Sequence, residues 1–457
     1  MAISSLGLGS GVLTQDVLDK LRKADEAGRI TPIDRELQTL KTQKSEFSVL
    51  DATMTNFSDA VNELKSKTLY DERQATVTGT SVSVTADANS DVQDFTLNVT
   101  QLATKQIEES GSYGAKTDTI ASDTGNLTLS VGSSDFTINY DSTTTLEDLK
   151  KSINDIAGQK VNATIVQIAS GDFRLFLNSV DTGSNQDISI TDNSGNLSGT
   201  QLTDDLSSVQ DGVDAKFDFN GQAITRHSNQ VDDLITGYHI TLKEVGSSDV
   251  SVQQNRDAIL KRVDSFVEKY NAAMTELDKV TKNSTNADER GVFSSESGIS
   301  GMQDAIRNAM DTIGGGVGTI YDYGFDIDKD GKMSIDKTVF NQKLDENAGN
   351  VEVFFSGGAF DNGDGTTTTI DGAFADLSTI TESYTGYGKI LDSFSKNLDA
   401  SQTTLQERRA TAVERLNNKY ETLQKQWGAY DALIARLNSS ADAFIQMVNA
   451  QNNSQNN

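Results

Sequence analysis

The sequence predicts an α+β multidomain protein in which long helices at both ends enclose an inserted, β-rich head. Three observations lead to this prediction. Apolar residues recur with heptad spacing near both ends of the 457-residue chain, they alternate with a period of two in the middle, and a further helical pattern follows the alternating region. Apolar residues make up 35% of the chain, which allows several modest cores rather than one large core.

The first long helix is expected from the segment TPIDRELQ onward. Thr31 stands where an N-cap residue belongs, and Pro32 follows at the first helical position, where its missing N–H costs no hydrogen bond. Apolar residues then recur in steps of three and four, which is a heptad seam that requires a partner helix. The residues of this seam are Phe47, Leu50, Met54, Phe57, Val61 and Leu64.

Strands are expected between Thr76 and Val245. Short runs of alternating apolar and polar residues occur there, and each run is bounded by Gly, Asn, Asp or Ser. Gly158 ends the one helix expected among them, in the segment TTTLEDLKKSINDIAG. The predicted apolar face of this helix consists of Leu146, Leu149, Ile153 and Ile156. The regular spacing of the runs predicts one or two compact β-rich modules.

A helical pattern returns after the strands. The segment AILKRVDSFVEKYNAAMTELDKV places six apolar residues on one face, and a shorter helix is expected in GISGMQDAIRNAMDTI. The six residues are Ile259, Val263, Phe266, Tyr270, Met274 and Leu277. Because helices stand on both sides of the strands in sequence, the simplest topology is a long helical stalk that carries the strands as an inserted head.

The C-terminal region repeats the heptad pattern over a longer distance. Its seam positions follow steps of four and three without a break, which favours coiled-coil or bundle packing over the core face of an ordinary helix. The positions are Leu416, Tyr420, Leu423, Trp427, Tyr430, Ile434, Leu437, Ala441, Phe444 and Val448. The pattern extends upstream, with polar interruptions, at Leu391, Phe394, Leu398 and Leu405. We predict that the two seams, within residues 47–64 and 416–444, form coiled-coil contacts and mediate oligomerisation.

The formal net charge of −28 is concentrated in the middle of the chain. Residues 1–75 hold 10 basic and 12 acidic residues, and residues 386–457 hold 8 and 7, whereas residues 76–385 hold 21 and 48. An acidic body repels phosphate backbones, so nucleic acid is not expected as a partner. The nearly neutral ends are free of this repulsion and can pack against each other or against further copies.

Several function classes are disfavoured by composition. Cysteine is absent, which excludes disulfides, a thiolate nucleophile and a Cys-based zinc site. No stretch of about 18 apolar residues exists, so no membrane span is expected. The N-terminal residues show no cleavable signal peptide. Pro32 is the single proline, which leaves one slow isomerisation step and suits a chain that is exported unfolded.

The segment FDIDKDGKMSIDK resembles the start of a calcium-binding loop through its aspartates and Gly331. A calcium loop that begins at Asp326 requires a bidentate carboxylate at its twelfth position, and Lys337 stands there instead. Alternating residues flank the Asp330-Gly331 pair, which favours a β-hairpin over a metal site. The stretch from Asp361 to Gly365 is expected to be a flexible loop, and cation binding there stays open.

No catalytic or cofactor-binding constellation emerges. His227 and His239 have no nucleophile or second ligand at motif spacing. The glycines at residues 314–316 lack the lysine and the preceding strand of a phosphate loop. The segment GLGSG at residues 7–11 resembles a dinucleotide fingerprint only superficially, because no strand precedes it. We therefore expect no enzyme, no cofactor and no resident metal.

Several stretches of the chain resemble the flagellar hook-associated protein 2 family, which forms the filament cap of bacterial flagella. The matching stretches are SSLGLGSGVLTQDVLDKL near the N-terminus, DAKFDFNGQAITRHSNQVDDLITGYHITLKEV at residues 214–245, DAILKRVDSFVEKYNAAMTEL after it, the segment from Phe325 to Asp336, and RLNNKYETLQKQWGAYDALIARLNSSADAFIQ near the C-terminus. Each stretch is weak alone, and the order and spacing of the five make the resemblance specific.

The resemblance implies a domain organisation. An N-terminal coil region is expected at residues 1–42, and a C-terminal coiled coil at residues 406–457. A helical leg domain would combine the helix at residues 43–77 with residues 246–405. One β-rich head domain would combine residues 78–118 with 203–245, and residues 119–202 would form a second head domain with one helix.

The resemblance also implies a role and partners. Members assemble as rings, usually pentameric, at the tip of the growing flagellum, where they retain exported flagellin and promote its folding and insertion. Expected partners are further copies of the chain, flagellin, and the flagellar export apparatus with its chaperone. Two alternatives stay open: another flagellar axial protein, such as flagellin or a hook-filament junction protein, and a calcium-dependent surface adhesin with a role in cell adhesion.

Overall fold

The computed structural model describes residues 6–7, 9–12, 14–312 and 316–455. It divides into two compact units. The helical unit comprises residues 1–66 and 260–457, and the β-rich unit comprises residues 67–259. This division confirms the predicted fold class, an α+β multidomain protein with strands inserted between helical segments.

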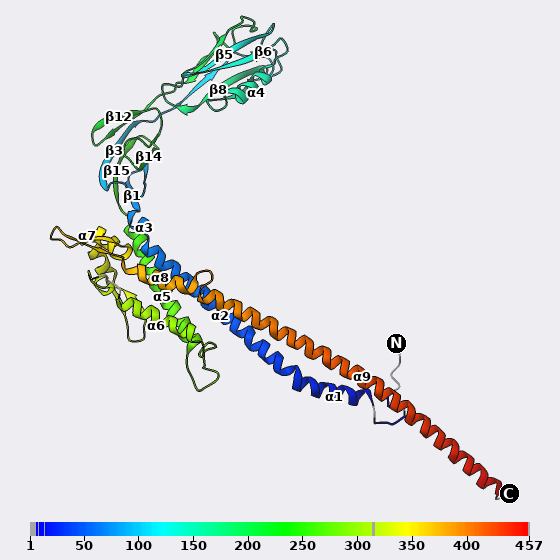
Figure 1. Cartoon of the computed structure of the whole chain (residues 1–457). Coiled ribbons are helices and arrows are strands. Elements are labelled where there is room, and N and C mark those ends of the chain that lie inside the picture. The colour runs from blue at the N-terminus through cyan, green and yellow to red at the C-terminus, as the bar shows by residue number, and fades with distance from the viewer. Residues whose placement is uncertain (1–5, 8, 13, 313–315, 456–457) are drawn as a thin grey trace. The chain divides into compact units, whose positions relative to one another are not determined.

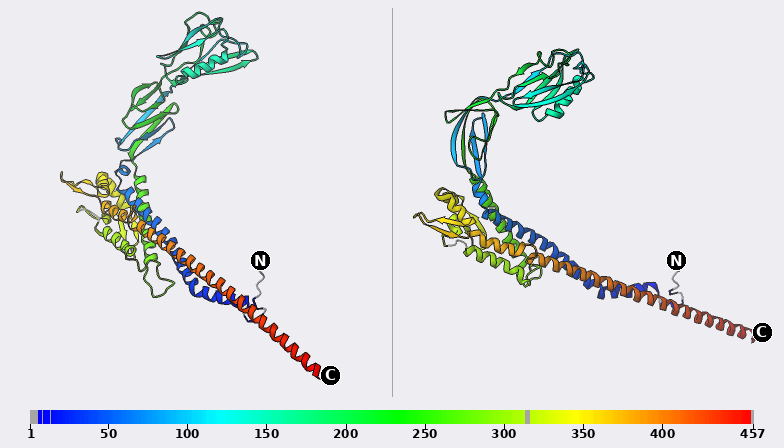
Figure 2. Two further views of the ribbon diagram at one scale, coloured as in Figure 1. Left: turned by 45° about the vertical axis from the view of Figure 1, so that its right-hand side comes forward. Right: turned by 45° about the horizontal axis from the view of Figure 1, so that its top comes forward.

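Long helices dominate the helical unit. They are α1 (Gln15–Arg29), α2 (Thr31–Lys65), α5 (Arg256–Thr281), α6 (Ser297–Thr312), α7 (Lys337–Ser356), α8 (Ala373–Thr385) and α9 (Ile390–Gln455). Figure 1 shows α9 alongside α2 and then α1, and the two views of Figure 2 show the same pairing. The N-terminal and C-terminal parts of the chain are therefore neighbours.

The start of α2 differs from the predicted cap. Ile30, with helical φ and ψ of −99° and −46°, is the N-cap residue, and Thr31 is the first residue of α2. The Thr31 hydroxyl donates to the carbonyl oxygen of Glu26 in α1 at 3.4 Å. The cap prediction was wrong because α1 ends directly before α2, so that the chain is already close to helical where a cap would need extended backbone.

The core of the helical unit is rich in aromatic rings. The six predicted residues of α5 are all buried, which confirms its apolar face. The ring of Phe266 lies 5.9 Å from Phe57 of α2 and 4.9 Å from Phe374 of α8, and Phe355 of α7 stacks on Phe374 at 5.2 Å. These contacts join α2, α5, α7 and α8 around one core.

Two hairpins complete this unit. The predicted hairpin is confirmed as β16 (Phe325–Ile327) paired antiparallel with β17 (Met333–Ile335). The Asp328 carboxylate accepts hydrogen bonds from the N–H groups of Asp330 and Lys332, both at 2.9 Å, and thereby stabilises the turn. The stretch from Asp361 to Gly365, expected as a flexible loop, connects the strands of a second hairpin, β18 (Gly358–Asp361) and β19 (Thr367–Ile370). This hairpin follows α7 in the sequence, and the short helix η1 (Ile320–Tyr323) precedes the first hairpin.

The β-rich unit contains the short helix α3 (Lys67–Asp71), the helix α4 (Leu146–Ala157) and the strands β1 to β15. The strands are β1 (Arg73–Thr78), β2 (Val82–Ala86), β3 (Gln93–Gln101), β4 (Lys105–Glu109), β5 (Gly125–Val131), β6 (Ser134–Tyr140), β7 (Val161–Ala169), β8 (Asp172–Thr182), β9 (Ile188–Asp192), β10 (Ser207–Gln210), β11 (Ala215–Phe219), β12 (Gln222–Arg226), β13 (Gln230–Val231), β14 (Tyr238–Leu242) and β15 (Gly246–Gln254).

The strands form sheets around separate cores. One core lies between the five-stranded sheet β1-β15-β3-β11-β12 and the three-stranded sheet β13-β14-β2, and it includes Phe95, Phe217 and Tyr238. Another core is enclosed by the sheets β10-β4-β8-β7 and β6-β5-β9 together with α4, and it includes Leu129 and Leu177. The alternation of buried and exposed residues along these strands follows the period of two that the sequence shows.

The boundaries of the modules differ from the expected ranges. Strands β1 and β15, which we assigned to the leg, pair along their whole length from Arg73↔Gln254 to Thr78↔Asp249 and belong to the first sheet. Strand β4, assigned to the first head domain, pairs with β8 and β10 of the other core. On α4 the buried residue of the last turn is Ala157, and Ile156 is 50% exposed, so the predicted apolar face was wrong by one position there.

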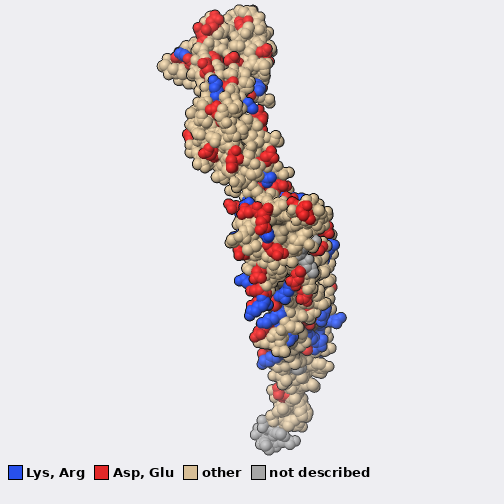
Figure 3. Space-filling view, turned by 90° about the vertical axis from the view of Figure 1, so that its left-hand side faces the viewer, with Lys and Arg blue, Asp and Glu red and all other residues tan. Residues whose placement is uncertain are grey.

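Charge is distributed unevenly on the surface. On the face drawn in Figure 3, acidic side chains predominate over the β-rich unit, whereas basic and acidic side chains intermingle along the helical unit. Some of the charged side chains of the helical unit form ion pairs between helices, such as Lys419 with Asp25 at 2.5 Å and Arg409 with Asp34 at 2.5 Å. The near-neutral ends predicted from the sequence are therefore paired helices with balanced charge.

Candidate assembly surface

The first predicted seam, from Phe47 to Leu64 on α2, is buried within this chain. Its six residues are at most 6% exposed. The ring of Phe47 lies 5.3 Å from Phe394 of α9 and 6.4 Å from Phe293, and the ring of Phe57 lies 5.9 Å from Tyr270 of α5. The partner that the heptad pattern requires is thus supplied by helices of the same chain, and in this conformation these six side chains are not available to another subunit.

The second seam begins with a small core between α1 and α9. Leu18 and Ile30 are buried against Leu416 and Tyr420 of α9. Leu423 and Trp427 pack at the edge of this core and are partly buried. This core accounts for why α1 lies alongside α9.

Polar contacts surround the α1–α9 core. The Tyr420 hydroxyl donates to the Asp25 carboxylate at 3.0 Å, and Lys419 bonds the same oxygen at 2.5 Å. These two hydrogen bonds, that of Lys419 first, lower the pKa of Asp25 below its ordinary value. Because the ion pair is partly exposed to solvent, its contribution to stability is small, and it mainly fixes how α1 and α9 align.

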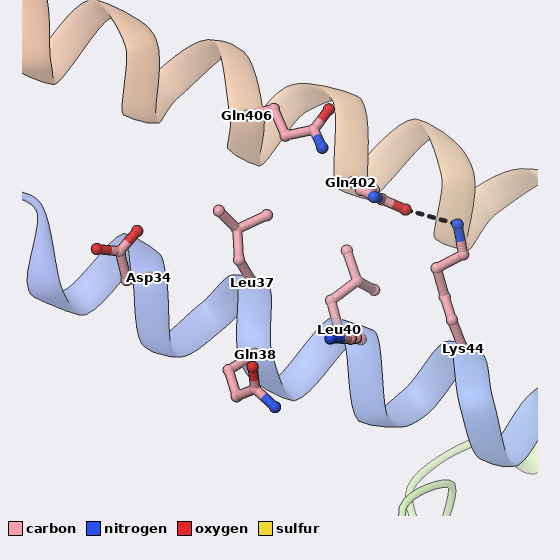
Figure 4. Close-up of a pocket in the computed structure, with 8 residues that line it drawn as sticks. Asp34, Leu37, Gln38, Leu40, Lys44, Gln402 and Gln406 are labelled. Carbon is pink, nitrogen blue, oxygen red and sulfur yellow. Dashed lines mark hydrogen bonds between the residues drawn. The ribbon is translucent and has the colours of Figure 1, made fainter.

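Two grooves flank the α2–α9 pair around Leu40. The first has a volume of about 440 Å³, and Figure 4 shows Leu37 and Leu40 of α2 directed toward α9, which presents Gln402 and Gln406 there. The second has a volume of about 680 Å³, and its lining includes Leu398 and Leu405. Gln402 and Gln406, which interrupt the upstream seam with polar side chains, line the first groove. Lys44 bridges the first groove by bonding Gln402 at 2.5 Å and Asp399 at 2.6 Å.

The last third of α9 carries the rest of the second seam on its surface. Tyr430, Leu437 and Phe444 are 61%, 60% and 65% exposed, and Ile434 is half-buried. No helix packs along this face among the residues whose side chains are described, which are residues 6–451 except 8, 13 and 312–315. Contiguous exposed apolar surface of this kind is typical of interaction sites in general.

Sequence reasoning missed part of this surface. Leu433, Ile445 and Met447 are 54%, 54% and 66% exposed beside the seam positions and widen the apolar face. The heptad count overlooked them because they fall between the a and d positions, although a plot of all apolar residues around the helix would have found them. Asp431, which is 2% exposed, was also missed, and its long-range partners have no local sequence signal.

The two histidines considered for other chemistry belong to the β-rich unit. Each histidine pairs with carboxylates of the β-rich unit: His227 Nδ1 lies 2.7 Å from Asp214, and His239 lies 2.9 Å from Asp232 and 3.3 Å from Asp87. The hydrogen bonds to Asp232 and Asp87 raise the pKa of His239. Gly314 and Gly315 lie outside the described residues, as does Leu8 of the GLGSG segment.

The described residues contain no metal-binding cluster and no membrane-spanning helix. No group of three or more His, Asp or Glu side chains is arranged there to hold a metal ion. Likewise, none of the described helices is both long enough and apolar enough to cross a bilayer.

Comparisons with known proteins identify the family. The family model for the flagellar hook-associated protein 2 N-terminus matches residues 10–106, and that for its C-terminus matches residues 212–439. The chain is 25% identical over 472 residues to flagellar hook-associated protein 2 of Aeromonas caviae, covering 98% of each chain. It is 27% identical over 414 residues to that of Campylobacter jejuni, covering 78% of this chain and 64% of the relative.

A solved structure has a similar fold. The D1-D2-D3 domains of the flagellar cap protein FliD from Escherichia coli superpose with a TM-score of 0.62 at 20% identity, covering 78% of this chain and 99% of that one. The two family models match the chain on both sides of residues 107–211, and the Aeromonas relative aligns over 98% of each chain. The chain therefore belongs to the flagellar hook-associated protein 2 family, the structural cap proteins found at the tip of the bacterial flagellar filament.

Proposed function

We propose that this chain assembles with further copies of itself into a ring at the distal end of the filament, where it retains exported flagellin and promotes its folding and insertion. The expected ring is a pentamer. The expected route to the tip is through the flagellar export apparatus, with the help of an export chaperone. No enzymatic step is part of this proposal.

The observation that carries the proposal is the exposed apolar face of α9. The face runs from Tyr430 to Val448 and includes Leu437 and Phe444. Each large apolar side chain that is taken out of water by a partner helix contributes about 1.5–3 kcal/mol, so several of them make contact with other subunits favourable. Of the seam residues predicted to mediate oligomerisation, only those exposed on α9 remain candidates for contact with other subunits.

The two units fit different parts of this role. The acidic β-rich unit stays solvated and repels other acidic surfaces, whereas α1, α2 and α9 carry balanced charge and apolar grooves. We propose that neighbouring subunits touch through the helical unit and that the exposed part of α9 exchanges contacts as each flagellin enters. The free energy comes from flagellin, which buries apolar surface as it folds, so no nucleotide is needed.

A double substitution tests the proposal without removing the helix. Replacing Leu437 and Phe444 with serine removes apolar surface from α9 and leaves its backbone intact. A matched control replaces the exposed polar residues Gln446 and Asn449 with serine on the same helix. Sedimentation velocity over a range of concentrations reports assembly, and filament length in cells that lack their own cap protein reports function.

We expect the Leu437→Ser, Phe444→Ser protein to sediment as smaller species than the wild type and to support short filaments or none. The control protein should match the wild type in both assays. Unchanged sedimentation together with filaments of normal length would refute the role assigned to α9.

A further inference from the structure

The segment before α1 contains a glycine-rich loop, defined by its described residues Gly7, Gly9, Ser10 and Gly11. The loop closes on itself, because the N–H of Gly11 donates to the carbonyl oxygen of Gly7 at 3.1 Å. Gly7 and Gly11 have φ angles of 94° and 66°, which glycine adopts without strain. This is the GLGSG segment that resembles a dinucleotide fingerprint superficially, and the structure gives it a different ligand.

The loop surrounds the carboxylate of Asp431 on α9. The N–H of Gly9 donates to Asp431 Oδ2 at 3.1 Å, and the N–H and hydroxyl of Ser10 donate to Asp431 Oδ1 at 2.8 and 2.7 Å. Asp431 is 2% exposed in a stretch of α9 where most neighbouring side chains face solvent. Successive backbone N–H groups that converge on one carboxylate form an anion-binding concavity.

The fit between the loop and α9 is close. A Cβ atom on Gly9 would stand 2.2 Å from the backbone oxygen of Asp431 and 2.7 Å from the backbone nitrogen of Ala435, so only glycine allows this approach. Two turns further along α9, the Asn438 side chain donates to the carbonyl oxygen of Gly9 at 3.0 Å. Donors and acceptors of the loop are therefore both matched by α9.

We propose that the glycine-rich loop is a carboxylate-binding site, that its ligand is the Asp431 side chain of the same chain, and that this contact fixes the N-terminal segment on α9 between Asp431 and Asn438. Together with the small core at Tyr420, it attaches the N-terminal region to α9 at two places. Between Asp431 and Asn438, Tyr430, Leu433 and Leu437 of the apolar face stay exposed beside this attachment.

The electrostatics agree with a charged ligand. Hydrogen bonds from the Gly9 backbone and the Ser10 hydroxyl lower the pKa of Asp431, so the carboxylate is ionised at neutral pH. An ionised acceptor strengthens each of these hydrogen bonds relative to a neutral one. Burial without such donors would instead disfavour the charge.

Hydrogen exchange of the full-length protein tests the proposal. In the wild type, the peptide that spans residues 6–14 should show protected amides, because Gly9 and Ser10 donate to Asp431. Asp431→Ala should accelerate exchange of these amides on the order of tenfold. Sodium acetate should restore the protection by supplying a free carboxylate to the vacated site, and sodium chloride at equal ionic strength should not. Asp442→Ala is the matched control, because it removes an exposed carboxylate from the same helix.

A second variant separates close packing from charge. Gly9→Ala should lose the same protection with Asp431 intact, and acetate should not restore it, since the added methyl group blocks the approach to α9. Wild-type exchange in Asp431→Ala, or equal effects of acetate and chloride, would overturn the proposal. Protection that increases with protein concentration would show that Asp431 of another copy is bound and would overturn the intrachain assignment.

The test is independent of the assembly proposal. The measurements are made at a dilution at which sedimentation shows monomers. The Leu437→Ser, Phe444→Ser protein should retain the protected loop, because neither side chain contributes to the hydrogen bonds with Asp431. A failure of assembly and a failure of the loop contact are thus observed separately.

Discussion

Replacing Phe57 with alanine is expected to destabilise the helical unit by about 4 kcal/mol. The Phe57 side chain is fully buried, and its ring centroid lies 5.9 Å from both Phe266 and Tyr270. A buried phenyl group removes roughly 150–250 Å² from water, which at about 25 cal/mol per Å² corresponds to about 4–6 kcal/mol as an upper bound. Core Phe→Ala substitutions typically cost about 3–5 kcal/mol, which places the expectation in the lower part of this range.

Replacing Phe444 with alanine is the matched comparison. This side chain occupies the same kind of seam position but is 65% exposed, so most of its apolar surface is already in water. Alanine also has the higher helix propensity by a few tenths of a kcal/mol, which offsets part of the lost contact. We therefore expect the free energy of unfolding to change by less than about 0.5 kcal/mol, while assembly weakens.

Urea unfolding followed by circular dichroism at 222 nm measures both variants, because most of the helix lies in the helical unit. The two units need not unfold together, so the helical transition is fitted separately. A loss below about 1.5 kcal/mol for Phe57→Ala, or an equal loss for both variants, would refute the reasoning from burial.

Three further substitutions test local features. Thr145→Ala should destabilise α4 by about 1 kcal/mol, seen as faster hydrogen exchange in the peptide 146–157, because the capping box with Asp148 is lost. Burial and the hydrogen bond to Asp192 raise the pKa of Tyr140 to about 12, so the stabilisation from its neutral form is complete below pH 10.0 and is lost as the pH rises toward 12. Absorbance at 295 nm should show this late titration of Tyr140. The Tyr140→Phe protein should lack the loss of thermal stability that accompanies it. Gly428→Ala should slow exchange of the surrounding part of α9, since a Cβ atom there meets nothing within 4 Å and alanine favours the helix by about 0.5–1 kcal/mol; faster exchange would contradict the open surroundings of this position.

Local patterns in the sequence were sufficient for most elements. The period of two located strands between Thr76 and Val245 but missed β15. The segment around Asp330-Gly331 was correctly identified as a hairpin because turn chemistry depends on neighbouring residues. The cap at Thr31 could not be predicted, because it depends on where the preceding helix ends. Strands β1 and β15 lie in the ranges that the resemblance implies for the leg, and the pairing that places them in the first sheet joins residues far apart in the chain, which local patterns do not reveal.

The candidate site shows the same division between local and long-range causes. A heptad seam states that one face of a helix will be covered, and it does so equally for Phe57 and Phe444. It cannot predict which element will cover that face, since this depends on what the fold brings near: Phe266 and Tyr270 of α5 pack against Phe57, whereas Phe444 is 65% exposed. Exposure of a seam in the folded subunit, rather than the seam itself, is therefore the property that separates an assembly surface from a core.

The contact between the glycine-rich loop and Asp431 extends this reasoning to polar groups. Its two sides are separated by more than 420 residues in sequence, and neither side has a partner nearby that would reveal it. Gly9 is required by close approach to α9, which no turn prediction can detect, and an aspartate beside a seam position reads locally as a solvated charge. The surroundings of Asp431 and Gly9 reveal the contact once the fold is known. A carboxylate that the fold buries must be stabilised by hydrogen-bond donors, and a glycine without a positive φ is explained by a neighbour that leaves no room for a side chain.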